Sequence, residues 1–330
     1  MATVIRHQGQ EMRQNATSKV SFLRSQLILF NSRRKHGLLY SIATAGALFC
    51  VPGVLGVIAS ETEMNLLIQR TIPLPLITLM ITVGMFVLND LVDKDLDKAN
   101  SKKRPIASEL VSRRQAWTFI ILTNGAAVGM LLILFDLLSV VVVLPMILIG
   151  ILYSMTKIAL MKRFLFKNVS IAIFYMLCAI LGMTSIYGRD LVINNPIVLV
   201  HTIAISGVMI FVGSIVNDLG DTEGDKAAGR HTIPVVLGGG NTIKMLIILL
   251  AIMPAISWML YETSAELNYH AISIMAPIGV TIVASLALLR MATIHRVFED
   301  RDLMRKQHKK WFPLYMALQS CHVIAGFSPL

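Results

Sequence analysis

Nine long apolar stretches constrain the fold of this chain more than any other feature of its sequence. They cover residues 37–59, 72–91, 115–134, 137–156, 168–187, 196–217, 242–261, 271–290 and 312–327. Each is about as long as the roughly 20 residues that a helix needs to cross the hydrocarbon core of a bilayer. Little more than Asp136 separates the third stretch from the fourth, so the count is least secure there. The pattern predicts an all-α polytopic membrane protein with about nine transmembrane helices.

The positive charges divide unequally between the two ends of these stretches. Of the 30 Lys and Arg residues, only Arg70 and Arg189 fall on one side. The others lie in the segments 1–36, 92–114, 157–167, 218–244 and 290–310. Basic loops remain in the cytoplasm, so these five segments are predicted to be cytoplasmic and the C-terminus to lie opposite. The net charge of +11 then serves orientation and contact with anionic membrane lipid, and no basic–aromatic platform indicates nucleic acid binding.

An acidic motif follows the second apolar stretch, at residues 89–97. If the helix continues through it, Asp90, Asp93 and Asp97 stand at i, i+3 and i+7, which is one helical face. Asp95 falls about 140° from Asp90 at roughly 100° per residue, so it is expected to lie off that face. Three neighbouring carboxylates repel one another unless a positive charge lies between them. A hard divalent cation such as Mg2+, which prefers oxygen ligands, fits that need.

The motif occurs twice. A second acidic segment, residues 217–225, follows the sixth apolar stretch and places Asp218, Asp221 and Asp225 at the same spacing. Asn217 precedes it as Asn89 precedes the first, and Glu223 takes the off-face position. The repetition indicates two pseudo-repeats within a membrane domain at 37–330, preceded by a polar, basic cytoplasmic segment at 1–36. Ionisable groups that occur in matched motifs at a membrane boundary are more often functional than simply solvated helix ends.

These two motifs resemble those of the UbiA superfamily of intramembrane prenyltransferases. The first, NDLVDKDLDKANSKKRP, matches the family signature NDxxDxxxD, and the second, NDLGDTEGDKAAGRHTIPVVLG, matches its second acidic motif. Tyr153 and Lys157 match a Tyr-x-x-x-Lys element between the motifs. The resemblance covers nearly the whole chain from residue 37 onward. It implies nine transmembrane helices around a central cavity, with the motif loops as a cytoplasmic lid.

The resemblance also implies an activity and a site. A prenyl diphosphate would bind through two Mg2+ ions, and a lipophilic acceptor, such as an aromatic quinone precursor or another nucleophile, would take the prenyl group. The implied metal ligands are Asn89, Asp90, Asp93 and Asp97 for one ion, and Asn217, Asp218, Asp221 and Asp225 for the other. By the resemblance, Tyr153 and Lys157 would contact diphosphate, with Lys157 also counted as catalytic. The basic residues near the motifs are expected from their charge to bind and neutralise diphosphate; they are Arg104, Lys162, Arg163, Lys167, Lys226 and Arg230. Asp90, Asp93, Asp97, Asp221 and Asp225 are the other expected catalytic residues.

Two alternatives remain open at this level. Some UbiA-like proteins are class I terpene cyclases, which ionise a prenyl diphosphate and need no external acceptor. A secondary transporter also has repeats and intramembrane charges, but its charges are expected near mid-membrane rather than at helix ends. The sequence does not identify the acceptor or the length of the prenyl chain.

Overall fold

The computed structural model describes residues 20–55, 65, 69, 72–99, 103–135, 137–155, 160–194, 196–266 and 272–327, and every element in these ranges is helical. The long helices are α2 (Phe22–Leu55), α4 (Pro73–Val92), α6 (Arg113–Leu134), α7 (Leu137–Ser154), α8 (Phe164–Asn194), α9 (Pro196–Leu219), α12 (Gly239–Glu266), α13 (Met275–Val297) and α15 (Phe312–Phe327). The short helices are α5 (Lys94–Ala99), η1 (Leu160–Lys162), α10 (Thr222–Ala227), α11 (Ile233–Leu237) and α14 (Arg301–Lys309). The predicted all-α class is confirmed.

Seven helices among the described residues are long and apolar enough to cross a membrane. They are α4, α6, α7, the Phe164–Ser185 part of α8, α9, α12 and α13. Because α6 and α7 are separate helices, the closely spaced third and fourth stretches are correctly counted as two. Helices α2 and α15 occupy the first and ninth stretches, but α2 begins ahead of the predicted start and α15 has 16 residues. The count of nine stays a prediction.

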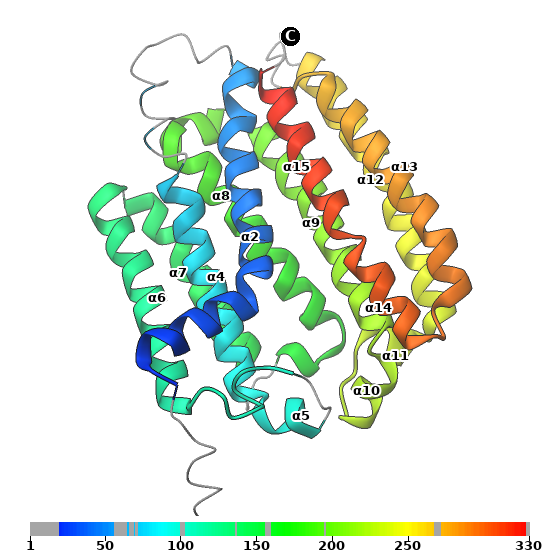
Figure 1. The fold of residues 1–330 in the computed structure, drawn as a ribbon. Helices are drawn as coiled ribbons and strands as arrows, with labels where there is room; N and C mark the ends of the chain where they lie inside the picture. Colours follow the sequence, from blue (N-terminus) through cyan, green and yellow to red (C-terminus); the bar gives the residue numbers. More distant parts are fainter. Residues whose placement is uncertain are drawn as a thin grey trace, which may run out of the picture.

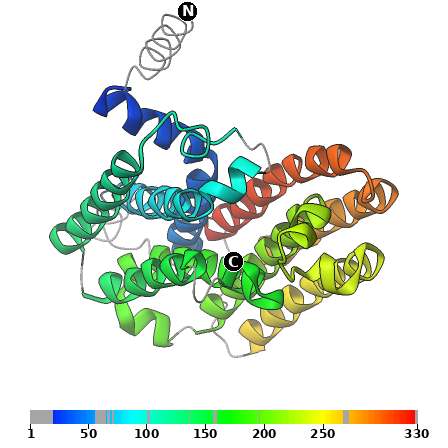
Figure 2. The same cartoon turned by 90° about the horizontal axis from the view of Figure 1, so that it is seen from below.

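The long helices pack side by side in a closed circuit (Figures 1 and 2). The order around the circuit is α2, α4, α7, α8, α9, α12, α13, α15 and back to α2, with α6 outside α4. Helix α2 also packs against α8, which ties the two halves of the circuit together. There Thr44 Oγ1 lies 2.9 Å from Thr78 Oγ1 of α4 and donates to the Cys178 carbonyl of α8 at 3.0 Å.

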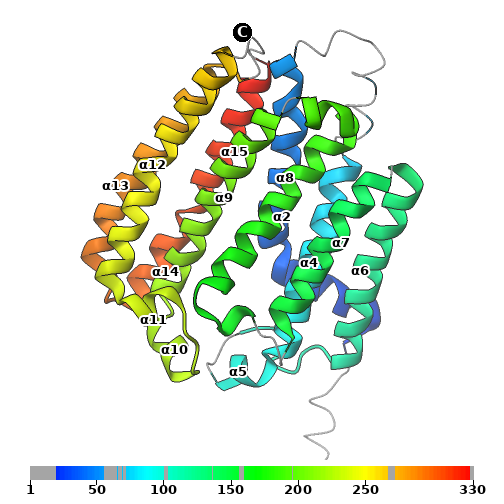
Figure 3. The ribbon, with the colours of Figure 1, turned by 180° about the vertical axis from the view of Figure 1, so that it is seen from behind.

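The short helices α5, α10, α11 and α14 gather at one end of this bundle, opposite the C-terminus (Figures 1 and 3). Local sequence explains where the neighbouring helices begin. Ser112 and Gln115 form a capping box that starts α6, and the Asp300 side chain caps the first turn of α14. Both acidic motifs lie at this end of the bundle.

The acidic motifs are not continuous helices, which corrects the sequence-based expectation. Helix α4 ends at Val92, Asp93 interrupts it, and α5 begins at Lys94. In the second motif α9 ends at Leu219, and a turn at Gly220 and Asp221 precedes α10. Main-chain hydrogen bonds still run from Asp97 N to Asp93 O and from Asp225 N to Asp221 O, each 2.8 Å long. Each motif therefore bends without losing its helical hydrogen bonding altogether.

Helices α2 and α4 approach closely because α2 has a glycine, Gly37, where it faces α4. A Cβ atom at Gly37 would lie 2.5 Å from Val83 Cγ2 and 2.6 Å from Leu79 Cδ1, closer than real side chains allow. Glycine therefore lets the two backbones come together. The close approach brings the residues just before Gly37 against the last turns of α4.

Candidate active site

The first motif is neutralised by two arginines from different parts of the chain. Asp90, at the end of α4, is buried and receives hydrogen bonds from Arg33 of α2 and from Arg104. The Arg33 Nε to Asp90 Oδ2 distance is 2.7 Å. Arg104 Nη1 also lies 2.9 Å from Oδ2 of Asp97, which is buried in α5. Arg104 thus joins the first and last aspartates of this motif.

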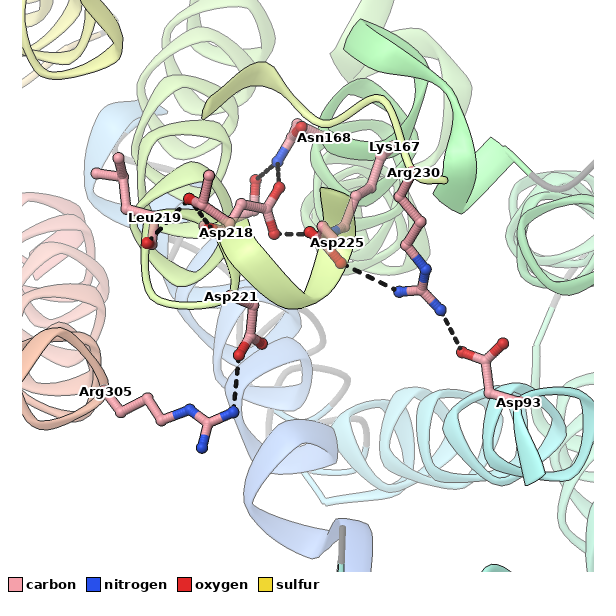
Figure 4. A network of polar contacts seen from close by, with 11 residues as sticks. Asp93, Lys167, Asn168, Asp218, Leu219, Asp221, Asp225, Arg230 and Arg305 are labelled. Carbon is pink, nitrogen blue, oxygen red and sulfur yellow. Dashed lines mark hydrogen bonds and ion pairs between the residues drawn. The ribbon is translucent and has the colours of Figure 1, made fainter. Parts of the chain in front are cut away.

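The second motif is neutralised in the same way by a lysine. Lys167, near the start of α8, places Nζ 2.5 Å from Asp218 Oδ1 and 3.8 Å from Asp225 Oδ2. Asn168 donates from Nδ2 to Asp218 Oδ2 at 3.1 Å and to Ser214 Oγ at 2.9 Å. Burial raises the pKa of Asp225, and the neighbouring Lys167 opposes that shift. Figure 4 shows these side chains converging between α8 and the end of α9.

The middle aspartate of each motif faces a different cation. Arg230 Nη2 lies 3.1 Å from Asp93 Oδ2, and its Nη1 lies 3.7 Å from Asp225 Oδ1, so one guanidinium links the two motifs. Asp221 instead pairs with Arg305 of α14 at 2.8 Å and is partly exposed (Figure 4). The structure therefore does not bring Asp221 to the cation that Asp218 and Asp225 share.

The two motifs are equivalent in their contacts as well as in their spacing. In each, the first and last aspartates share one cation, and the middle aspartate turns toward another. In each, the first aspartate also receives a hydrogen bond from the preceding long helix in the circuit, α2 in one case and α8 in the other. This correspondence is what two pseudo-repeats would produce.

A helix C-cap positions Arg230. Gly229 has a φ of +64°, a left-handed conformation that favours glycine, and it ends the segment that contains α10. Arg230 N donates to Asp225 O at 2.8 Å and Gly229 N to Lys226 O at 3.1 Å, the pair of bonds typical of a Schellman motif. The chain turns back sharply there, which directs the Arg230 side chain toward Asp93.

The remaining predicted residues divide by exposure. Asp95 and Glu223 are exposed, as their off-face positions predict. Asn89 is half-buried, whereas Asn217 is exposed, so the two asparagines are not equivalent. Tyr153 is half-buried.

Among the predicted basic residues within the described part of the chain, Arg104, Lys167 and Arg230 are brought to the buried carboxylates by the contacts above. Lys162, Arg163 and Lys226 are exposed. Lys157 lies outside the described residues. Tyr153 lies within electrostatic range of Lys167, so it belongs to the same end of the bundle.

Sequence reasoning missed Arg33, Asn168 and Arg305. It placed Lys167 among the basic residues expected to neutralise diphosphate, but not beside the second acidic motif. A signal for Arg33 was present. Arg33 falls on the helical stripe of α2 that also contains Leu29, Gly37 and Tyr40, all of which are buried. A charge on the buried side of a helix needs a partner. Asn168 and Arg305 gave no comparable local signal.

The carboxylates of the two motifs are ligands that suit Mg2+, although in this structure they pair with Arg and Lys side chains. Among the described residues, no three acidic, histidine or cysteine side chains form a ready-made metal cluster. Five buried carboxylates nevertheless surround this end of the bundle, and carboxylate oxygens are the ligands that Mg2+ prefers. Asp225 Oδ2 and Asn168 Oδ1 are buried without a hydrogen-bond partner in the described part of the chain. Such oxygens are costly unless a ligand or ion satisfies them.

Comparison of the sequence with models of known protein families identifies the family of this chain. The model of the UbiA prenyltransferase family matches residues 49–317, which is most of the chain. The chain belongs to the UbiA prenyltransferase family. Its apolar helices are therefore those of an integral membrane protein, and its enzymatic class is that of a prenyltransferase.

Individual UbiA relatives agree with this assignment. The chain is 26% identical over 199 residues to a digeranylgeranylglyceryl phosphate synthase from Natronomonas pharaonis. The matched region includes 60% of this chain and 65% of that relative, which is just under two thirds of the relative's length. A solved structure of a digeranylgeranylglyceryl phosphate synthase has a TM-score of 0.65 at 17% identity, covering 93% of this chain and 99% of that one. A UbiA homologue from Archaeoglobus fulgidus bound to GPP and Mg2+ has a TM-score of 0.61 at 17% identity, with coverages of 91% and 99%. These two structures establish the shared fold.

Proposed function

We propose that the protein transfers a prenyl group from a prenyl diphosphate to a lipophilic acceptor, with Mg2+ as the required metal. The observation that carries this proposal is the Arg230 bridge, which brings Asp93 of one motif and Asp225 of the other to a single guanidinium. Both carboxylates are buried, and they lie at one end of an apolar helix bundle. A molecule with an anionic head and a long apolar tail matches such a surface.

The residues have complementary roles in this proposal. Asp90, Asp93, Asp97, Asp218 and Asp225 hold the metal, and Asp221 completes the second set if it leaves Arg305. Bound Mg2+ would supply positive charge that offsets the negative charge of these carboxylates and of a departing diphosphate. Arg33, Arg104, Lys167 and Arg230 lie among the same acids and provide donors for phosphate oxygens.

The apolar helices behind the site would accommodate the prenyl chain and exclude water from the allylic cation. The excess of Lys and Arg in the segments at this end of the bundle supports a cytoplasmic location for the site. The donor is amphipathic, so its anionic head would remain in water while its chain lies among the apolar helices.

The relatives suggest which acceptor to test first. A digeranylgeranylglyceryl phosphate contains two geranylgeranyl groups, so its synthase must add one of them to a glyceryl phosphate that already carries the other. We propose the hydroxyl of such a glyceryl phosphate lipid as the acceptor class, ahead of an aromatic quinone precursor. The nucleophile in that case is an alcohol oxygen, which loses a proton during transfer.

Incubation of the purified protein with separate prenyl diphosphates tests this function. Geranyl, farnesyl and geranylgeranyl diphosphate should each be supplied with Mg2+, alone and with geranylgeranylglyceryl phosphate or an aromatic acceptor. Mass spectrometry is expected to find an ether-linked product that needs both acceptor and Mg2+. A cyclic hydrocarbon formed without acceptor would replace the transferase assignment by a cyclase.

A further inference from the structure

His36 lies one helical turn below the ion pair that closes the first motif. Arg33 and His36 are three residues apart on α2, and Phe86 and Asp90 are four residues apart on α4. Arg33 pairs with Asp90, and the His36 and Phe86 rings meet with centroids 5.0 Å apart. One helical turn rises about 5.4 Å, so His36 is displaced from the acidic face by about that distance along the bundle.

That position is where a bound prenyl diphosphate would react. If its diphosphate lies against the acids and arginines, the first carbon of the prenyl chain follows within a few bond lengths on the apolar side. Beyond His36, the ring of Tyr40 packs edge-on against Phe174 and Tyr175, with centroids 5.2 and 5.4 Å away. These three rings are buried and apolar on their faces. His36 therefore stands at the border between the charged site and the aromatic interior.

The imidazole is both accessible and uncharged at neutral pH. His36 keeps an exposed side chain. Loss of water to the protein packed around it, followed by the charges of Arg33, Arg104 and His308, lowers its pKa to about 4. His36 precedes the first predicted membrane span. A neutral imidazole has one nitrogen free to accept a proton. Protonation becomes easier when negative charge develops on a departing diphosphate beside it.

His308 is the other histidine near the site, and its surroundings suit it less. It lies on α14 within electrostatic range of Asp218 and Asp221, the second motif, and is half-buried. A histidine there faces the carboxylates proposed to hold metal rather than the apolar side of the site. His36 has no acid among the groups that shift its pKa.

We infer that His36 is the general base that removes the proton from the acceptor hydroxyl during transfer. This inference rests on the proposed function. In the step, the acceptor oxygen forms a bond to C1 of the prenyl group while the C1–O bond to diphosphate breaks. The bonding electrons leave with the diphosphate, and the hydroxyl proton passes to the free nitrogen of His36. The proton then leaves to solvent or to the released diphosphate, which restores the neutral imidazole.

The test separates cleavage of the donor from transfer to the acceptor. Diphosphate release is measured first with geranylgeranyl diphosphate and Mg2+ in the absence of acceptor. Transfer is then measured after geranylgeranylglyceryl phosphate is added. His36→Gln is expected to lower kcat for transfer by about 100-fold or more, the usual contribution of a general base, with little change in the acceptor KM. Acceptor-free release should persist. His36→Ala should behave similarly and recover transfer when imidazole is added to the assay.

His295→Gln provides a matched control. His295 is also exposed, and its ring centroid lies 6.1 Å from that of Phe298, but it belongs to the last turn of α13 and not to α2. Its loss should leave transfer unchanged. If His36→Gln transfers at the wild-type rate, or loses release and transfer equally without imidazole rescue, His36 is not the base. If the wild-type protein releases no diphosphate from any prenyl donor, the proposed function itself fails.

A variant that does not fold would be recognised by its elution and thermal unfolding in detergent. His36→Asn then takes its place, because asparagine keeps a hydrogen-bonding group of smaller size against Phe86. Loss of transfer with retained diphosphate release in that variant supports the base, and full transfer overturns it.

Discussion

The guanidinium of Arg230 lies 3.1 Å from the carboxylate of Asp93, although 137 residues separate them in the chain. The same guanidinium lies 3.7 Å from Asp225. One side chain therefore fixes the distance between two acidic motifs that belong to different halves of the sequence. A planar guanidinium can contact two carboxylates at once, which a single ammonium does less well.

Replacement of Arg230 tests this link. Arg230→Ala should lower kcat/KM for the prenyl diphosphate by about 100-fold, the usual cost of losing one electrostatic donor at a reacting group. Arg230→Lys should retain part of the activity because it keeps the charge. Initial rates at several donor concentrations provide the measurement. Lys226→Ala removes an exposed cation of the same segment and serves as the control. Equal activity in Arg230→Ala and Lys226→Ala would contradict the role of the bridge.

The acidic face predicts a sharp contrast between neighbouring carboxylates. Asp93→Ala or Asp221→Ala should abolish Mg2+-dependent turnover, because each removes a proposed metal ligand. Asp95→Asn and Glu223→Gln should retain most of it, since both side chains are exposed. Turnover is followed by diphosphate release across a Mg2+ titration. Near-normal turnover in both alanine variants would refute the two-motif clamp.

Lys167 predicts a stability effect that depends on charge. Lys167→Met would leave Asp218 buried without its cation, and breaking a buried pair in this way costs about 3–5 kcal/mol. Thermal unfolding in detergent without Mg2+ should show the loss.

Two further variants decide whether the uncompensated charge causes that loss. The double variant Lys167→Met with Asp218→Asn should recover stability, because the buried negative charge is removed as well. Lys162→Met, at an exposed position on the same segment, is the control. Equal melting temperatures for Lys167→Met and Lys162→Met would show that the buried pair is unimportant.

The rate of transfer should not change near pH 6.5, where an ordinary histidine gains or loses its proton. Loss of water to the protein packed around the imidazole, followed by the charges of Arg33, Arg104 and His308, lowers the pKa of His36 to about 4. A lowered pKa keeps the imidazole neutral, and therefore able to accept a proton, as the pH falls from 8 to 6. The kcat/KM for transfer, which reports the free enzyme, should be flat over about that range. A limb near pH 6.5 that His36→Gln abolishes would contradict this environment.

Cysteine labelling tests the orientation of the site. A Ser108→Cys variant and a Glu266→Cys variant place thiols at exposed positions at opposite ends of the bundle. Cys50, Cys178 and Cys321 should first be replaced by alanine. A membrane-impermeant maleimide is expected to label position 108 only from the cytoplasmic side and position 266 only from the other. The reverse pattern would overturn the cytoplasmic assignment of the acidic motifs.

The sequence predicted some parts of the site better than others. The helical face of each motif was correctly expected to separate Asp90 and Asp97 from Asp95, because 3.6 residues per turn decide which side chains share a face. The same rule failed to anticipate the bends at Asp93 and Gly220. Those bends turn Asp93 and Asp221 toward separate cations.

Arg33, Lys167 and Arg305 illustrate what local patterns leave out. Each belongs to a basic segment whose charges are explained adequately by membrane orientation. Burial distinguishes Arg33 and Lys167 from their exposed neighbours Arg34 and Arg163. A sequence does not show which charge of such a run is buried unless the apolar stripe beside it is traced, as it can be for Arg33.

The membrane-spanning character of the chain, the spacing of its two acidic motifs and the exposure of Asp95 and Glu223 could all be predicted from the sequence. Each depends on a local property, either the length of an apolar stretch or the periodicity of a single helix. Contacts between helices establish which cation meets which acid, that Arg230 joins the two motifs, and that His36 lies below Arg33 and Asp90. Those relationships depend on how closely separate helices approach, and the residues that permit the approach, such as Gly37, act on neighbours far away in the chain.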